Sequence, residues 1–157
     1  MRKTLIMIGI VILCCTYNAM AEELKAGFIK NVSGQSYIER NKVIIHAAAN
    51  EKLMEKDILI TGKDGAMGVI LQDNGVMSMG PNTRVEIAKF LFEPAADKLS
   101  FTARIKQGTV VYLTGLIAKL NRKGIKFETP TTVCGVRGTH FAIKVEGSGK
   151  ESCVDQL

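Results

Sequence analysis

Apolar and polar residues alternate along residues 99–106. The apolar positions are Leu99, Phe101, Ala103 and Ile105, and the polar ones are Ser100, Thr102, Arg104 and Lys106. Successive side chains of an extended chain point to opposite faces, so this alternation is typical of a strand with one buried face. The segment therefore predicts a β-strand that packs one side against a core.

Two other segments, residues 66–71 and 109–113, are apolar on both of their alternating sides. In a sheet with one wet face, such strands would leave hydrophobic side chains in water. Strands of this kind are typical of sheets that are covered on both faces. We therefore expect stacked sheets or a solenoid-like coil that covers both sides of these segments.

Turn-forming residues recur at short spacing between the apolar runs. They are Ser33-Gly34, Thr61-Gly62, Asp64-Gly65, Asp73-Asn74-Gly75, Gly80-Pro81-Asn82, Glu93-Pro94, Gln107-Gly108, Lys123-Gly124 and Thr129-Pro130. Short strands separated by such turns predict an all-β domain. Leu113, Leu116, Ile117 and Leu120 instead follow a helical spacing, which predicts at most one short helix near 114–121, as a core-facing connection.

The first residues have the order of a secretory signal peptide. A positive start at Arg2 and Lys3 precedes about eleven uncharged, mostly apolar residues, 5–15, and the small-x-small site 19–21 follows. The apolar run is shorter than the roughly 20 residues of a membrane span, so cleavage near Ala21 is favoured over a signal anchor. A lipoprotein signal fits poorly because Leu13 precedes the first cysteine. We expect a periplasmic or secreted protein.

The remaining residues, 22–157, predict a single β domain without a further membrane span. Residues 22–56 would form its first strands and a connection, and 147–157 a polar tail. Without the signal peptide, 19 basic residues face 15 acidic ones, a net charge of +4. The basic stretch 119–126 has few aromatic neighbours and reads as a solvated connection, so we expect no nucleic-acid partner.

Cys134 and Cys153 are the cysteines left after signal cleavage. In an oxidising compartment they can form a disulfide, which would stabilise the domain by roughly 3 kcal/mol in the chain-entropy model. The alternative is a buried Cys134 thiol and a separate thiol in the tail. The sequence leaves both open.

Few residues suited to catalysis are present. The histidines are His46 and His140, and histidine is the residue type suited to proton transfer near neutral pH; the carboxylates of Asp64 and Asp73 stand in Asp-Gly and Asp-Asn-Gly turns. The histidines and cysteines lack a recognisable zinc spacing. We therefore expect no catalytic residue, cofactor or metal, and a small exported hydrolase or carbohydrate-active protein is the alternative that rests on these four residues.

The turns and strands from Asp57 to Val145 follow a recognisable order. The elements are Asp57–Gly62, Ala66–Leu71, Asp73–Gly75, Gly80–Val85, Gly108–Val110 and Thr129–Phe141. This series, over about 90 residues, resembles the FecR-type domain family. The resemblance implies an all-β, solenoid-like stack of short strands.

FecR-type domains form the periplasmic part of iron-siderophore sensor/anti-sigma regulators and also occur in stand-alone exported proteins. Here the domain directly follows the predicted signal peptide, without the anti-sigma segment and transmembrane helix that sensor regulators carry ahead of it. The resemblance therefore implies a non-catalytic binding, sensing or protein-interaction module in the bacterial cell envelope. Its partner would be another envelope protein or a cell-envelope ligand.

The family motif positions have structural interpretations. They comprise Gly62, Asp73, Gly75, Pro81, Asn82, Gly108, Pro130, Gly135, Arg137, Gly138 and Thr139. We expect unusual backbone angles at Gly62, Gly75, Gly80 and Gly108, and an extended start of a strand at Pro130.

The glycines of Gly135-Val136-Arg137-Gly138 suggest a bend or a close backbone approach. Arg137 between them either lies partly inside, bound to carbonyls or a carboxylate, or is an exposed strand residue. Both readings stay open at this point.

Overall fold

The computed structural model describes residues 25–136, 139–146 and 151–156. These residues form thirteen strands, one 3-10 turn and one short α-helix, so the predicted all-β class is confirmed. The predicted signal peptide, and with it the cleavage site at Ala21, lies outside the described residues. Arg137 and Gly138 also lie outside them.

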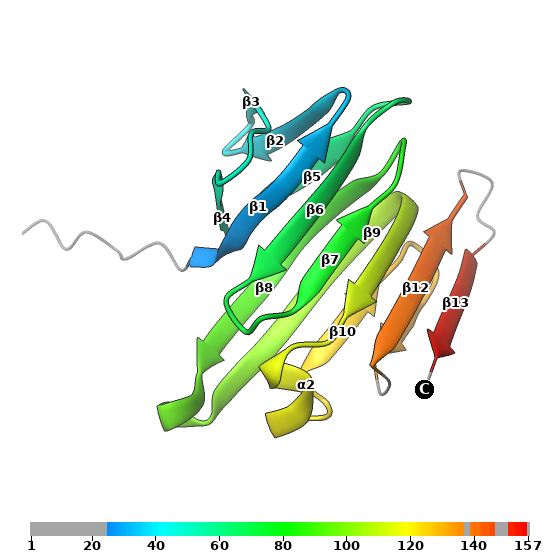
Figure 1. The fold of residues 1–157 in the computed structure, drawn as a ribbon. Helices are drawn as coiled ribbons and strands as arrows, with labels where there is room; N and C mark the ends of the chain where they lie inside the picture. Colours follow the sequence, from blue (N-terminus) through cyan, green and yellow to red (C-terminus); the bar gives the residue numbers. More distant parts are fainter. Residues whose placement is uncertain (1–24, 137–138, 147–150, 157) are drawn as a thin grey trace, which may run out of the picture.

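The strands form one continuous sheet that bends into two layers (Figure 1). Layer A contains, in order, β4 (Lys52–Met54), β1 (Lys25–Ser33), β6 (Ala66–Leu71), β7 (Val76–Met79), the second half of β9 (Lys98–Leu113), β12 (His140–Val145) and β13 (Glu151–Gln156). Layer B contains β3 (Val43–His46), β2 (Ser36–Arg40), β5 (Ile58–Thr61), β8 (Arg84–Glu93), the first half of β9, β10 (Ile125–Glu128) and β11 (Val133–Gly135).

Two short elements connect strands of the sheet. The 3-10 turn η1 (Pro94–Ala96) joins β8 to β9, and the helix α2 (Leu116–Leu120) joins β9 to β10. Because α2 returns the chain to the start of β9, β10 pairs with β9 in parallel, while every other described pairing is antiparallel. The predicted helix is thus present.

The strand β9 belongs to both layers because it is sixteen residues long. Its first half pairs with β8 and β10, and its second half pairs with β7 and β12. The alternating residues of its first half have the predicted orientation, since Leu99, Phe101, Ala103 and Ile105 are all buried. The expectation of short strands does not hold for β9.

Four of the places where the chain passes between the layers lie next to one another, residues 34–35, 62–65, 80–83 and 107–108, and we call them the fold line. The backbone N–H of Gly62 donates to the carbonyl of Gln35 at 2.7 Å, and the N–H of Asn82 donates to the carbonyl of Gly62 at 2.9 Å. Each crossing is therefore hydrogen-bonded to the next one.

Two buried threonines complete the hydrogen bonding of the fold line. The Thr61 hydroxyl donates to the carbonyl of Gly80 at 2.7 Å and accepts from the N–H of Thr83 at 3.0 Å. The Thr83 hydroxyl accepts from the N–H of Thr109 at 3.0 Å. Buried backbone groups need such partners, so the hydroxyls replace the strand hydrogen bonds that the bend interrupts.

Glycine conformation at the fold line differs from what the sequence suggested. Gly108 has φ +98°, and a Cβ there would collide with Thr83. Gly62, Gly75 and Gly80, however, do not have positive φ. In the turns of Gly75 and Gly80 the left-handed positions are taken by asparagines instead, which tolerate that conformation; they are Asn74 (φ 64°) and Asn82 (φ 50°).

The inner faces of the two layers meet in an aromatic core. The rings of Phe101 and Tyr112, from the two halves of β9, have centroids 5.6 Å apart. Phe127 of layer B lies 5.5 Å from Phe141 of layer A, and Phe90 lies 5.9 Å from Phe101. These tilted and edge-on contacts stabilise the stacking of the layers beyond the apolar area that they bury.

Residues before Asp57 are part of the same core. Arg40 of β2 donates from Nε and Nη2 to the two carboxylate oxygens of Asp57, at 2.8 and 2.7 Å, and also to the Lys52 carbonyl. The Asp57 side chain is only 1% exposed and also accepts from the N–H of Met54 at 2.9 Å. Breaking such a buried pair costs about 3–5 kcal/mol, so β2 and β4 are held firmly to the rest of the sheet.

Two expectations about the C-terminal half need correction. Residues 147–157 were expected to be a polar tail, but Glu151–Gln156 forms β13, which pairs with β12 along its length. The helical stripe was expected to face the core, but only Ile117 is buried, whereas Leu116 is 37% and Leu120 59% exposed. Among the described residues, no helix is long and apolar enough to span a membrane.

We predict that Gly108→Ala destabilises the domain. The substitution adds strain at a positive φ and a collision with Thr83, which together cost at least about 1–3 kcal/mol. The matched control is Gly80→Ala, where the added Cβ would meet its nearest atom at an ordinary 3.7 Å and φ is not positive. Urea unfolding should show a lower midpoint for the Gly108 variant, and equal midpoints for the two would contradict this account of the bend.

Candidate interaction surface

The outer face of layer B carries cross-strand ion pairs. Arg84 of β8 bonds Glu39 of β2 at 2.6 Å, and Arg104 of β9 lies between Glu86 of β8 at 3.1 Å and Glu128 of β10 at 3.0 Å. Alternating charges on neighbouring strands are typical of a sheet face in contact with water. The central strands of this face are therefore adapted to solvent, and its exposed apolar residues, Val43, Ile44 and Val133, lie on the edge strands β3 and β11.

The outer face of layer A carries rows of apolar residues beside exposed polar ones such as Ser78 and Lys144. Strand register places Phe28, Ile70, Val76 and Leu113 side by side across β1, β6, β7 and β9. A second row crosses β9, β12 and β13 through Val111, Ala142 and Val154. We call these seven residues the apolar face. Of its members, Phe28 is 39%, Val111 42% and Val154 49% exposed.

The apolar face explains the segments that are hydrophobic on both sides. Val69 and Val110 point into the core and are buried, as a stacked sheet predicts. Their neighbours Ile70 and Val111 point outward, and Val111 is exposed. The expected cover on the second side of these strands is not supplied by any part of the chain that the structure describes. Contiguous exposed apolar surface of this kind marks interaction sites.

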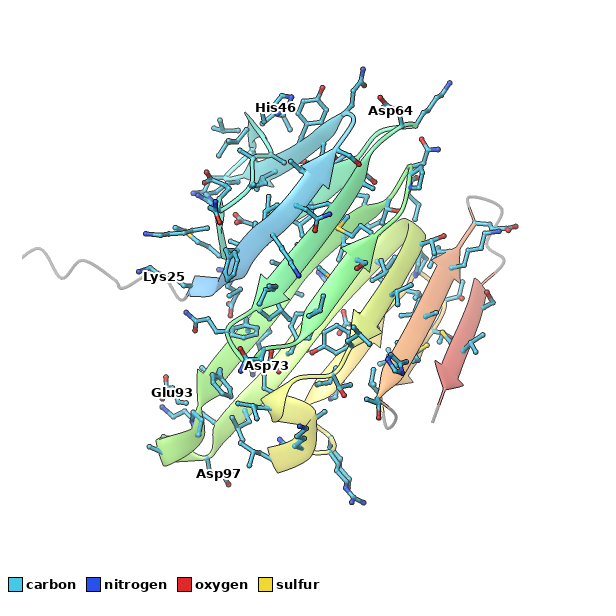
Figure 2. All side chains as sticks on the ribbon, in the orientation of Figure 1. Lys25, His46, Asp64, Asp73, Glu93 and Asp97 are labelled. Carbon is cyan, nitrogen blue, oxygen red and sulfur yellow. The ribbon has the colours of Figure 1, made fainter. Side chains whose placement is uncertain are left out.

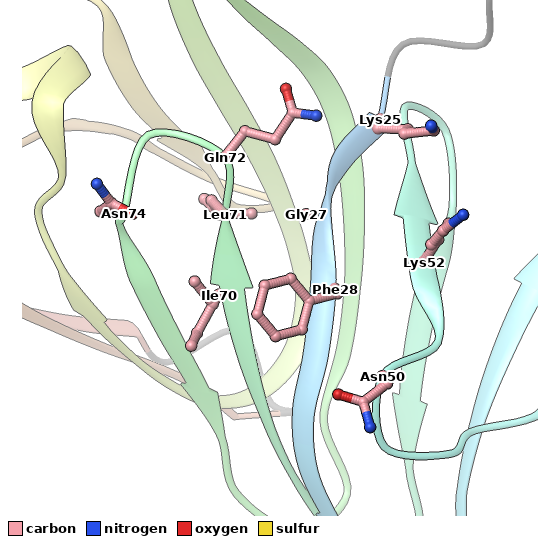
Figure 3. A pocket seen from close by; sticks show the side chains of 9 residues that line it. All are labelled: Lys25, Gly27, Phe28, Asn50, Lys52, Ile70, Leu71, Gln72 and Asn74. Carbon is pink, nitrogen blue, oxygen red and sulfur yellow. The ribbon is translucent and has the colours of Figure 1, made fainter.

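A groove of about 510 Å³ lies at the β1 end of the apolar face. Phe28 and Ile70 form its apolar floor, and Lys25 and Lys52 stand along one side (Figure 3). The remaining polar lining residues are Asn50, Gln72 and Asn74. A smaller hollow of about 320 Å³ lies at the other end, between Val111, His140, Ala142 and Val154.

The residues considered for catalysis lie apart (Figure 2). Asp64 is in the turn before β6 and Asp73 in the turn after it, at opposite ends of the strand. His46 is on β3 at the edge of layer B, and His140 is on β12 of layer A. No group of three His, Cys, Asp or Glu residues within the described ranges is placed to hold a metal ion. These four residues therefore do not converge on one site.

Asp73 has a structural function that its turn motif did not reveal. One carboxylate oxygen accepts from the N–H of Gly75 at 3.0 Å, which is the predicted turn. The other accepts from the N–H of Ile117 at 3.2 Å, and the Asp73 carbonyl accepts from the N–H of Leu116 at 2.7 Å. The side chain is fully buried and anchors the start of α2, which lies more than forty residues later in the chain.

Burial raises the pKa of Asp73 above its ordinary value, although hydrogen bonds from Gly75 and Ile117 partly oppose the shift. Burial also raises the pKa of Tyr112, and the nearby charge of Asp73 adds to this effect. Both groups lie beneath the β6–β7 turn. The turn residues Gln72 and Asn74, on either side of Asp73, are among those that line the groove.

The remaining motif positions are spread over the fold. Pro130 is exposed in the turn between β10 and β11, which a 2.8 Å bond from Thr129 N–H to the Thr132 carbonyl closes. Thr139 accepts from the N–H of Thr114 at 3.1 Å, and Pro81 accepts from the Thr83 hydroxyl at 3.2 Å. The close approach expected at Gly135 is wrong, since a Cβ there would meet nothing within 4 Å.

The two cysteines lie on strands that do not pair with each other. Cys134 is half-buried on β11 of layer B, and Cys153 is exposed on β13 of layer A. Their disulfide stays a prediction.

Comparison with known protein families supplies the missing context for this surface. The FecR protein family matches residues 57–155. The chain belongs to the FecR family. The predicted resemblance is thereby confirmed, and the family is one of signalling and regulatory modules. No curated protein and no solved structure matches the chain.

The FecR match begins at Asp57 and leaves out β1 to β4, which are integral strands of the sheet. The groove therefore combines FecR-region residues, such as Ile70 and Gln72, with residues that precede that region, such as Phe28 and Lys52. Sequence reasoning missed the groove because its two sides come from separate segments that only strand pairing brings together.

We predict that Asp73 makes the domain less stable as the pH rises. Because the folded-state pKa is raised, the folded state binds more protons than the unfolded state above about pH 3.8. The Asp73 contribution is thus most favourable below 3.8 and is lost as the pH rises through the raised pKa. Asp73→Asn should remove this dependence in urea unfolding across that range, with Asp64→Asn at an exposed turn as control. If the free energy of unfolding changed with pH in the same way for wild type and Asp73→Asn, the prediction would be wrong.

Proposed function

We propose that this FecR domain is a non-catalytic interaction module of the bacterial cell envelope, which binds a partner protein through the apolar face. The carrying observation is the contrast between the two outer faces. The central strands of layer B present ion pairs to water, and its exposed apolar residues lie on the edge strands β3 and β11, whereas layer A presents Phe28, Val111 and Val154 in rows that cross its strands. Covering such apolar surface is favourable by about 25 cal/mol per Å².

The signal-peptide pattern and the catalytic geometry support the two other parts of this proposal. A positive start, a short apolar run and the site 19–21 favour export and cleavage. The hydrolase alternative needed Asp64 and Asp73 to meet in one cleft, but they stand in different turns at opposite ends of β6. A surface patch therefore accounts for the domain better than a reactive centre does.

Export predicts a defined start of the mature chain. The protein recovered from a periplasmic extract should begin at Glu22, because the Ala19-Met20-Ala21 site follows a short apolar run. Intact-mass measurement checks this directly. Recovery of the full chain, with residues 1–21 attached, in the membrane fraction would show a signal anchor and contradict cleavage.

Binding through the apolar face predicts where a partner can be crosslinked. A photo-reactive phenylalanine analogue at Val111 should give one discrete adduct with another protein in cells, because Val111 lies in the centre of the face. The same analogue at Lys126, exposed on the outer side of layer B, is the control. Equal adducts from both positions, or none from Val111, would contradict the proposal.

A substitution on the same face separates binding from folding. Val111→Glu should leave the free energy of unfolding within about 0.5 kcal/mol of wild type, since the side chain is already partly in water. In this variant the photo-reactive analogue is placed at Val154. The crosslinked adduct with the partner should be lost, because binding would bury the glutamate charge at position 111 in the contact. An unchanged adduct would show that the face is not the contact.

A further inference from the structure

The charged residues that line the groove at the β1 end of the apolar face are all positive. Lys25 and Lys52 line it, and no acidic residue is among its lining residues. Neither lysine forms an ion pair with any residue that the structure describes. Two lysines with no acidic residue beside them in the groove, next to an exposed phenylalanine, suit an anionic ligand group.

The other polar side chains that line the groove are amides. Asn50, Gln72 and Asn74 each offer N–H donors and a carbonyl acceptor toward the groove (Figure 3). A peptide group presents the complementary donor and acceptor pair. Phe28 and Ile70 form the floor between these polar groups, where an apolar side chain would fit.

We infer that the groove binds an extended segment of a partner protein in which carboxylates alternate with apolar side chains. Its carboxylates face Lys25 and Lys52, an apolar side chain packs on Phe28, and its backbone bonds the amides. This inference rests on the proposed function and names the chemistry of the partner. Alternation is the geometry of an extended chain, whose successive side chains point to opposite sides.

The dimensions of the face fit such a segment. The apolar face runs from β1 through β6, β7, β9 and β12 to β13, and neighbouring strands lie about 4.8 Å apart, so it spans roughly 24 Å. An extended chain rises about 3.3 Å per residue, so roughly seven or eight residues would cover it. The groove with its lysines then receives one end of the segment, and the second hollow at Val154 receives the other.

Synthetic octapeptides test this inference on the signal-cleaved protein. One peptide alternates glutamate with phenylalanine and valine, and its partner replaces each glutamate by lysine. In NMR titrations the acidic peptide should bind and shift the amide signals of Phe28, Ile70 and Gln72, whereas the basic peptide should not. Equal binding of the two peptides would overturn the inference, and so would shifts confined to layer B.

Charge-reversed variants locate the binding. The double variant Lys25→Glu, Lys52→Glu should bind the acidic peptide with about tenfold lower affinity, since two favourable charge contacts become repulsive. Lys106→Glu with Lys126→Glu makes the same change in net charge on the outer side of layer B and should leave the affinity unchanged. Equal effects of the two double variants would show a response to net charge only, which overturns the groove as the site.

Two other occupants are distinguished by separate measurements. Flotation with vesicles of equal parts phosphatidylglycerol and phosphatidylcholine, without peptide binding, would assign the face to a lipid surface. Sedimentation as a dimer that Val111→Glu dissociates would assign it to a second copy. Either result overturns the acidic-segment inference. If instead the Val111 adduct persists while peptides fail to bind, the partner chemistry is wrong and the proposed function stands.

Discussion

The bend at the fold line is the constraint on which the rest of this structure depends. One hydrogen-bonded sheet can become two stacked layers only if its strands change direction without leaving buried backbone groups unpaired. Thr61 and Thr83 supply those missing partners through their hydroxyls. Gly108 lets β9 pass against Thr83 where a side chain would collide. The aromatic core, with rings from both halves of β9, follows from this bend.

The same bend creates two outer faces with different chemistry. Layer B distributes ion pairs over neighbouring strands, and layer A distributes apolar side chains over its own. Both faces have the same strand geometry, so the contrast comes from the side chains and not from the fold. The proposed function assigns the apolar rows of layer A to contact with a partner.

The groove depends on two buried carboxylates that lie beneath its sides. Asp57, paired with Arg40, holds β2 and β4 to the FecR region, and Lys52 stands on β4. Asp73 fixes the β6–β7 turn and the start of α2, and its neighbours Gln72 and Asn74 face the groove. Asp73 is kept in a place where burial disfavours its charge. The groove rim is therefore held by interactions inside the core.

Much of the architecture was determined by the sequence alone. Alternation over 99–106, the turn residues and the spacing near α2 are local signals, so they predicted the all-β class, the first half of β9 and the position of the helix. The order of motifs from Asp57 onward likewise predicted the FecR family. Each of these properties depends on residues that are close in the chain or follow a fixed order.

The tertiary structure decided what depends on distant residues. Arg40 meets Asp57, Asp73 meets Ile117, and Phe28 lies beside Ile70 because strands far apart in the chain pair in a particular register. No local pattern encodes that register, so both carboxylate anchors and the groove were missed. Hydrophobic residues on both sides of 66–71 indicated that a second contact was needed. Only the folded sheet showed that none of the described residues provides it, because exposure is a property of the assembled surface.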